Sequence, residues 1–171
     1  MTDKILVTYA SRTGSTAEIA EAIGKTLVEG GADVDVLPMQ EVKDLAPYRA
    51  VVAGSAIRGN KWLPEATQFV RTHQAALACK PFATFTVCIT LAMPGADRYR
   101  EAVRAWLAPV RALVKPVSEG LFAGRLDFSK LPFSLKKLQF HFAVALGIFP
   151  KDDRRDWQAI QGWAESLRPV L

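Results

Sequence analysis

Two kinds of hydrophobic pattern alternate along the chain. Short and almost uninterrupted apolar runs at residues 5–7, 50–55, 82–90 and 117–123 predict β-strands that are buried on both faces. Residues 32–37 instead alternate polar and apolar positions, which is typical of an edge strand with one face in water. We therefore expect five strands, with the second strand of the chain at an edge of the sheet.

Apolar residues recur at helical spacing in most of the segments that separate or follow these strands. The spacing predicts helices over residues 16–29, 64–78, 97–113 and 155–167. Pro64 suits the first turn of its helix, and Gly30 and Gly31 suit the end of the first one. His73 lies near the apolar face of the second helix, and we interpret it as a packed or half-exposed side chain.

Alternating strands and helices predict an α/β fold of three layers, with a five-stranded parallel sheet and helices on both faces. Right-handed crossovers, the polar edge strand and the three most apolar strands favour the strand order 2-1-3-4-5. In that order ligands bind beyond the C-terminal ends of strands 1 and 3. The loops at residues 11–16, 55–62 and 90–95 converge there. At 171 residues we expect one domain over residues 1–171.

Composition and charge exclude several classes of protein. Half of the residues are hydrophobic, which indicates a globular chain, and the start of the sequence has no secretory pattern. Cys79 and Cys88 form neither a CxxC motif nor part of a metal-ligand cluster, so we expect no metal site and a cytoplasmic protein with Cys88 as a buried thiol. The net charge of +5 comes without a stripe of basic and aromatic residues, so we expect no nucleic-acid partner.

A loop rich in hydroxyl groups follows the first strand and leads directly into the first helix. Ser15 and Glu18 have the spacing of a capping box. Free N–H groups and the positive end of the helix dipole converge at such a start, which favours a phosphate. An ordinary strand-to-helix turn with a good N-cap is the alternative. Gly24-Lys25-Thr26 is no P-loop, because Ile19 occupies the earlier glycine position, and no G-x-G-x-x-G is present.

The same loop resembles the S/T-x-T-G-x-T pattern that binds the FMN phosphate in flavodoxins, and it matches every specified position. The resemblance implies FMN as cofactor, with a phosphate site made of Ser11, Arg12, Thr13, Gly14, Ser15 and Thr16. The next two loops should then hold the isoalloxazine ring, through Ser55, Ala56, Ile57, Arg58, Trp62, Thr90, Leu91 and Ala92. Trp62 is either a stacking partner or a cap on the second helix, and Arg58 faces either the ring's N1–O2 edge or solvent.

A second resemblance extends along the chain. Gly54-Ser55-Ala56-Ile57-Arg58 is similar to the G-A/S-S-I-R loop of the menaquinone-dependent protoporphyrinogen oxidases, and Glu65-x-x-Gln68-Phe69-Val70, residues 120–126 and residues 152–157 continue the likeness. That family oxidises protoporphyrinogen IX in haem biosynthesis and passes electrons through FMN to a quinone. Gly59 directly follows Arg58 here, where the family has a tyrosine. The third loop lacks the aromatic and acidic residues of simple flavodoxins, which implies a more open ring.

Residues 125–149 are a basic and apolar segment that simple flavodoxins lack. Its pattern predicts a helix, for which three roles are open. The helix either binds a membrane surface, covers a flat apolar substrate, or packs on the sheet. A protein with this segment could therefore be peripheral at the inner face of the membrane.

Three functions remain open from the sequence. The first is an FMN-dependent oxidoreductase with a small-molecule or quinone partner, in which no side chain stands out as a catalytic base. The second is a non-enzymatic FMN electron carrier with a protein partner, against which the basic charge counts. The third is a binding module without flavin on the same fold.

Overall fold

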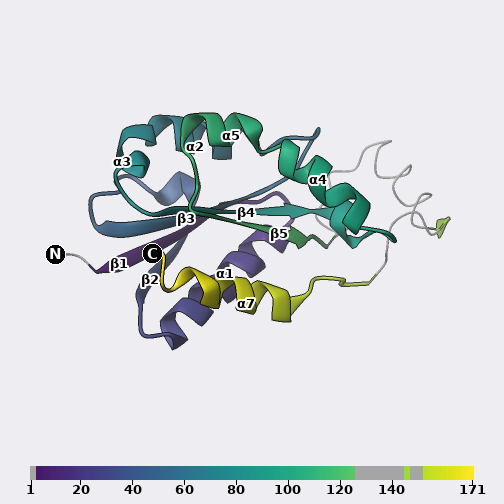
Figure 1. Cartoon of the computed structure of the whole chain (residues 1–171), viewed down its shortest axis with the longest axis horizontal. Coiled ribbons are helices and arrows are strands. Elements are labelled where there is room, and N and C mark those ends of the chain that lie inside the picture. The colour runs from purple at the N-terminus through teal and green to yellow at the C-terminus, as the bar shows by residue number, and fades with distance from the viewer. Residues whose placement is uncertain (1–2, 126–144, 147–151) are drawn as a thin grey trace.

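The sheet of this protein has the predicted strand order. The computed structural model describes residues 3–125, 145–146 and 152–171. Five parallel strands form one sheet in the order β2-β1-β3-β4-β5 (Figure 1). Their bounds are β1 Lys4–Ala10, β2 Asp33–Pro38, β3 Tyr48–Ala56, β4 Phe82–Cys88 and β5 Ser118–Ala123. The α/β prediction with β2 at the edge is therefore confirmed.

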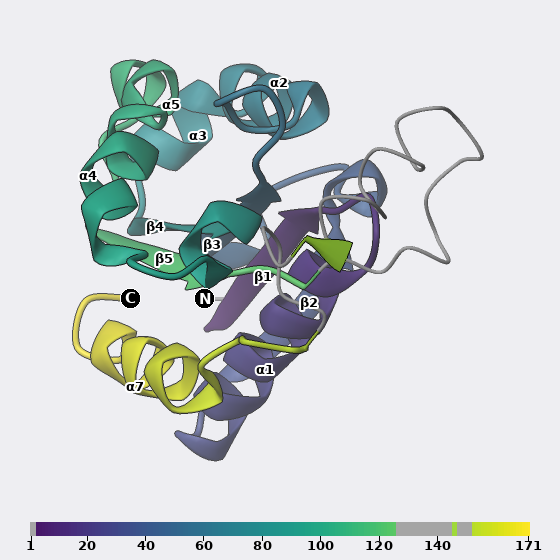
Figure 2. The ribbon, with the colours of Figure 1, turned by 90° about the vertical axis from the view of Figure 1, so that its right-hand side faces the viewer.

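Helices cover both faces of the sheet, as Figure 2 shows. One layer contains α1 (Ser15–Glu29) and α7 (Trp157–Leu167). The opposite layer contains α2 (Pro64–Thr72), α3 (Gln74–Ala78), α4 (Asp97–Ala105) and α5 (Ala108–Leu113). Two short 3-10 helices, η1 (Met39–Glu41) and η2 (Ile89–Ala92), follow β2 and β4. The three-layer arrangement follows from strands that are apolar on both faces.

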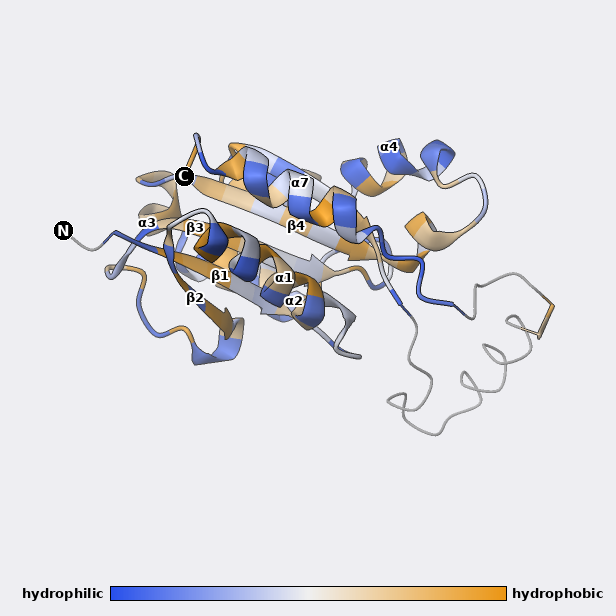
Figure 3. Ribbon diagram, turned by 90° about the horizontal axis from the view of Figure 1, so that it is seen from below, coloured by the Kyte–Doolittle hydropathy of each residue, from blue (hydrophilic) through white to orange (hydrophobic). Residues whose placement is uncertain are grey.

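Each face of the sheet has its own hydrophobic core. Ile5 and Val7 of β1 point toward α1 and α7, whereas Leu6 and Ala10 point toward α2, α4 and α5. The alternation follows from the two-residue period of a strand. Figure 3 shows hydrophobic residues concentrated on the strands, with hydrophilic residues along the outer sides of α1 and α7. Cys88 is buried and Cys79 exposed, and both are free thiols.

Two of the predicted helices are interrupted. The helix expected over 64–78 breaks at His73, whose φ of −100° and ψ of 15° lie outside helical values. The His73 ring is half-buried and lies 4.7 Å from the Phe69 ring, as a packed histidine would. The helix expected over 97–113 divides at Trp106 and Leu107, because Pro109 in the first turn of α5 cannot donate a helical hydrogen bond.

Two boundaries also differ from expectation, and one predicted segment lies almost entirely outside the described residues. The fourth strand ends at Cys88 and not at residue 90, because the chain turns there into η2. The last helix begins at Trp157 and not at residue 155, since the Asp156 carboxylate caps it by accepting from the Ala159 N–H at 2.9 Å. The basic segment 125–149 lies outside the described residues, except for Arg125, Ala145 and Leu146. In the described part, no helix has the length and apolar character needed to cross a membrane.

Gly54 lies opposite Phe85 in the centre of the sheet. A Cβ atom on Gly54 would lie 1.9 Å from the Phe85 Cζ atom, and the Phe85 ring is fully buried. We expect Gly54→Ala to lower the free energy of unfolding by about 1–3 kcal/mol, because the Phe85 ring must move within a packed core. Urea unfolding measures the change.

Gly162→Ala in α7 is the matched control for this substitution. No atom lies within 4 Å of the Cβ that it adds, and alanine favours a helix over glycine by up to about 1 kcal/mol. The control should therefore be neutral or stabilising. Equal unfolding free energies for the two variants would contradict the close contact between Gly54 and Phe85.

A polar cluster joins the edge strand β2 to β1 and β3. The Asp35 carboxylate accepts hydrogen bonds from the Tyr48 hydroxyl at 2.9 Å and from the Lys4 ammonium at 3.0 Å. Burial, together with the bond to Asp35, raises the pKa of Tyr48 to about 12. Burial also opposes ionisation of Asp35, but the bonds from Lys4 and Tyr48 prevail and lower its pKa.

The raised pKa of Tyr48 predicts a loss of stability in alkali. The pKa of Tyr48 is about 12 in the folded protein, above the value of about 10 in the unfolded chain. The contribution of the Tyr48 hydroxyl to stability is therefore complete below pH 10 and disappears as the pH approaches 12. We expect Tyr48→Phe to lower the free energy of unfolding by about 1 kcal/mol at neutral pH, and less between pH 10 and 12. Urea unfolding of both proteins across this range tests the prediction, and a difference that grows with pH would contradict it.

Candidate functional site

The candidate site lies at the C-terminal ends of the central strands. β1, β3 and β4 are adjacent and parallel, so the loops that follow them leave the sheet at the same edge. Ligands of open α/β sheets bind at this position, beyond the carboxyl ends of the strands and at the point where the strand order reverses. The structure thus brings together the three loops that the sequence analysis selected.

The first of these loops, residues 11–14, is built around a glycine. Gly14 adopts a left-handed conformation, with φ of 91°, which suits a residue without Cβ. Its N–H donates to the Ser11 hydroxyl oxygen at 3.1 Å, and its carbonyl accepts from the Glu18 N–H at 3.1 Å. The loop is therefore closed on itself and leads directly into α1.

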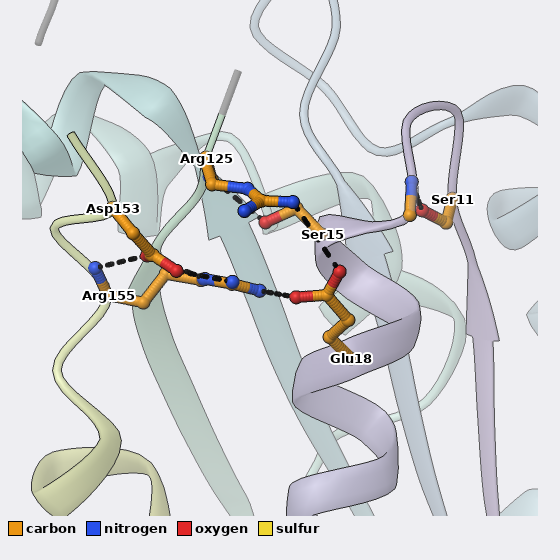
Figure 4. A network of polar contacts seen from close by, with 7 residues as sticks. Ser11, Ser15, Glu18, Arg125, Asp153 and Arg155 are labelled. Carbon is orange, nitrogen blue, oxygen red and sulfur yellow. Dashed lines mark hydrogen bonds and ion pairs between the residues drawn. The ribbon is translucent and has the colours of Figure 1, made fainter. Parts of the chain in front are cut away.

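The capping box predicted for this loop is wrong. Gly14 and not Ser15 is the N-cap of α1, and no side chain caps this helix. The Ser15 hydroxyl oxygen instead accepts the N–H of Arg125 at 3.0 Å, and the Glu18 carboxylate binds Arg155 (Figure 4). Both partners come from the C-terminal part of the chain, so the local pattern could not reveal them.

The first turn of α1 offers the donors that a phosphate requires. The N–H groups at the start of any helix have no acceptor within it, and here they belong to residues 15–17. Because Ser11 and Ser15 already accept from backbone N–H groups, their own hydroxyl protons are available for an anion. Thr13 adds a half-buried hydroxyl in the same stretch, whereas Thr16 is 1% exposed, so its contact with a phosphate stays a prediction. The donor set fits the phosphate of FMN.

An ion pair connects this loop to the start of α2. The Arg12 guanidinium binds both carboxylate oxygens of Glu65, in one case at 2.9 Å between Nη2 and Oε2. The bond from Arg12 lowers the pKa of Glu65, and the same bond raises the pKa of Arg12. Arg12 thus faces Glu65 and links the first loop to the helix that follows the second loop. In the sequence, Glu65 stands out only through its place in the Glu65-x-x-Gln68-Phe69-Val70 likeness.

The second loop forms a small hairpin at the site. Ile57 and Trp62 pair in an antiparallel bridge, and the Arg58 N–H donates to the Lys61 carbonyl at 2.9 Å. Gly59 and Asn60 both have positive φ angles, of 58° and 60°, which two-residue hairpin turns require. The glycine that replaces the family's tyrosine therefore makes a tight turn possible. The side chain of Arg58, next to this turn, is exposed.

Two residues of the second loop that were predicted to bind the ring have buried side chains. Trp62 is 2% exposed, and its indole N–H donates to the Thr86 hydroxyl oxygen at 2.9 Å. The alternative interpretation, in which Trp62 packs at the start of α2, agrees with this burial. The Ser55 hydroxyl accepts from the Leu63 N–H and donates to the Ala56 carbonyl, at 3.0 Å and 2.8 Å, so it organises the second loop from within.

The third loop begins with η2 and presents mainly its backbone. Leu91 and Ala92 are 7% and 5% exposed and pack inward, whereas Thr90 and Met93 are half-buried. Side-chain contacts to a ring would thus come from half-buried groups such as Ala56, Ile57 and Met93. Contacts of Ser55, Leu91 and Ala92 would come from their backbone, and these assignments stay predictions.

The structure adds residues beside α1 that the sequence analysis did not assign to the site. Arg125 follows β5, while Asp153 and Arg155 precede α7, and all three lie next to the first turn of α1 in Figure 4. The likeness within residues 152–157 was the signal that could have found two of them. Within the described residues no cluster of three potential metal ligands occurs.

Comparison with known proteins agrees with this geometry. The sequence model of the flavodoxin domain family matches residues 6–145. The protoporphyrinogen IX dehydrogenase (quinone) of Escherichia coli strain K12 is 29% identical over 93 residues, which cover 53% of this chain and 51% of that protein. The match thus spans about half the length of the curated relative.

Solved structures share the fold over nearly the whole chain. An archaeal flavodoxin superposes with a TM-score of 0.55 at 22% identity, over 96% of this chain and 99% of that one. A short-chain flavodoxin associated with a bacterial microcompartment gives 0.61 at 14% identity, with 97% of both chains covered. The flavodoxin of Streptococcus pneumoniae TIGR4 gives 0.59 at 19% identity, over 98% and 99%.

The family match includes β1, the loop after it and all the elements that position the three loops. The fold, the free N–H groups at the start of α1 and the sequence family therefore agree. This chain belongs to the flavodoxin domain family, and its cofactor is FMN.

Proposed function

We propose that this protein is an FMN-dependent oxidoreductase that oxidises a reduced tetrapyrrole, such as protoporphyrinogen IX, and passes the electrons to a quinone. The observation that carries the proposal is the likeness to the protoporphyrinogen IX dehydrogenases, whose name states both substrates. The described site supports it through a phosphate-binding turn at the start of α1. FMN, when bound, supplies the hydride and electron chemistry.

The chain's own residues would bind and orient the cofactor. The hydroxyls of Ser11, Thr13, Ser15 and Thr16 and the first N–H groups of α1 would hold the phosphate. The backbone of the second and third loops would hold the ring edge. Arg58, exposed in the second loop, would face the N1–O2 edge, where a cation favours the reduced anion.

The wider setting is part of the same proposal. Residues 1–171 would act as one domain, in the cytoplasm or at the inner face of the membrane, where a quinone is accessible. The basic segment 125–149 is the candidate for contact with a membrane or with an apolar substrate. A redox protein could be a further partner.

A non-enzymatic electron carrier is the alternative function. The three solved flavodoxins named above share the fold at identities of 14–22%, and a fold alone does not determine function. The net charge of +5 is opposite to the acidic surface expected of carriers in this family. The enzyme is therefore the function that we favour.

Removal of hydroxyls from the first loop should abolish tight FMN binding. We expect Thr13→Ala combined with Thr16→Ala to raise the dissociation constant for FMN at least about 100-fold, because two bonds to a charged phosphate are lost. Quenching of flavin fluorescence measures it, with circular dichroism to confirm folding. Thr72→Ala, on the exposed end of α2, is the control and should leave FMN binding unchanged. Unaltered affinity in the double variant would contradict the phosphate assignment.

Anaerobic spectroscopy separates the enzyme from the carrier. We expect protoporphyrinogen IX to bleach the visible band of the FMN-loaded protein, with a rise in porphyrin fluorescence, and a menaquinone analogue to restore the band. Free FMN at the same concentration is the control for uncatalysed oxidation. A loaded protein that reacts no faster than free FMN with the tetrapyrrole would contradict the enzyme and favour the carrier.

A further inference from the structure

A buried arginine ties the start of α1 to the segment before α7. The Arg155 side chain is 3% exposed. Its Nη1 donates to Glu18 Oε2 at 2.5 Å, while Nε and Nη2 donate to the two carboxylate oxygens of Asp153 at 2.8 Å and 2.5 Å. The Arg155 N–H also donates to Asp153 Oδ1 at 3.1 Å. Arg155 thus holds two carboxylates in fixed positions (Figure 4).

This cluster adjoins the predicted phosphate position. Glu18 lies in the first turn of α1, where the free N–H groups of the helix are found. Three residues earlier, the Ser15 hydroxyl oxygen accepts the N–H of Arg125, and the Arg125 guanidinium lies 3.7 Å from Glu18 Oε1. Glu18 therefore has an arginine on each of its carboxylate oxygens. Glu18, Asp153, Arg125 and Arg155 together carry no net charge.

An unpaired Glu18 would oppose a phosphate at the same helix end. A negative charge in the first turn interacts favourably with the helix dipole, but a phosphate dianion competes for the same positive potential. Repulsion between like charges is strongest at close range, and solvent screens only part of it here, because the Glu18 side chain is 41% exposed. Neutralisation of Glu18 by a fixed cation removes this repulsion.

We propose that Arg155 is a positioning residue for the cofactor phosphate. It neutralises Glu18 and holds the first turn of α1 in the geometry that leaves its N–H groups and the Ser15 hydroxyl free for the phosphate. The inference rests on FMN as the cofactor of the proposed function. The bond from Arg155 lowers the pKa of Asp153, so that this carboxylate stays charged and keeps Arg155 in place at neutral pH.

The difference between FMN and riboflavin isolates the phosphate contribution, because riboflavin has the ring without the phosphate. We expect Arg155→Met to raise the dissociation constant for FMN about tenfold and to change that for riboflavin less than about twofold. Fluorescence titration of both flavins measures the two constants. The phosphorus NMR shift of bound FMN should also change in the variant. If Arg155 had a purely structural role, Arg155→Met would weaken the binding of FMN and riboflavin alike.

Arg111→Met is the matched control. Arg111 binds Glu119 through Nε and Nη2 at 2.5 Å and 2.7 Å, and Glu119 lies near the start of β5, at the opposite end of the sheet. Loss of this ion pair removes a similar bidentate contact far from the phosphate. The control should lower stability and leave the ratio of the FMN and riboflavin constants unchanged.

Glu18→Gln completes the test, since it removes the charge that Arg155 neutralises. We expect this variant to bind FMN at least as tightly as the wild type. We expect the double variant, Arg155→Met with Glu18→Gln, to recover most of the FMN affinity that Arg155→Met alone loses. No recovery, or an unchanged ratio of the two constants in Arg155→Met, overturns the inference. If Arg155→Met does not fold, a loss of FMN affinity in Glu18→Gln alone overturns it. A wild type that does not prefer FMN to riboflavin would instead contradict the cofactor site.

Discussion

The unsatisfied N–H groups at the start of α1 are the feature on which the rest of the site depends. A helix start that faces solvent needs no special structure, but here the central strand β1 fixes its position between two neighbouring strands. The left-handed Gly14 ends the four-residue loop between β1 and α1 and directs the chain into the helix. The sheet therefore holds a set of hydrogen-bond donors at one point, beyond the C-terminal ends of its strands. The other two loops lie at the same edge and would contact the rest of the ligand.

The fold was predictable because burial dominates the sequence pattern. Strands buried on both faces have to be apolar at every position, so the runs in β1, β3 and β4 identify the centre of the sheet, and the alternating residues of β2 identify an edge. Strand order in turn determines which loops meet. The site's location thus followed from hydrophobicity, before any residue was assigned to a ligand.

Side-chain partners were less predictable because they come from distant residues. Ser15 and Glu18 match a capping box, yet Arg125 and Arg155, which lie 110 and 137 positions further along the chain, bind these side chains instead. An arginine offers a stronger interaction to a carboxylate than a neutral backbone N–H does. Trp62 illustrates the same limit of local patterns, since Thr86 of β4 satisfies its indole N–H within the core.

The burial of Trp62 changes how the ring site would work. A flavin stacked between aromatic side chains is covered on both faces, whereas Trp62 contributes its surface to the core. The tight turn at Gly59 and Asn60 also lacks the tyrosine that follows the loop arginine in the protoporphyrinogen oxidases, which this loop resembles. Both features reduce the side-chain volume that these loops offer above the ring. A planar substrate needs that space to approach the flavin, whereas a carrier that transfers single electrons does not. The second loop therefore leaves space for a planar substrate, although the same feature sets this chain apart from the oxidases that have the tyrosine.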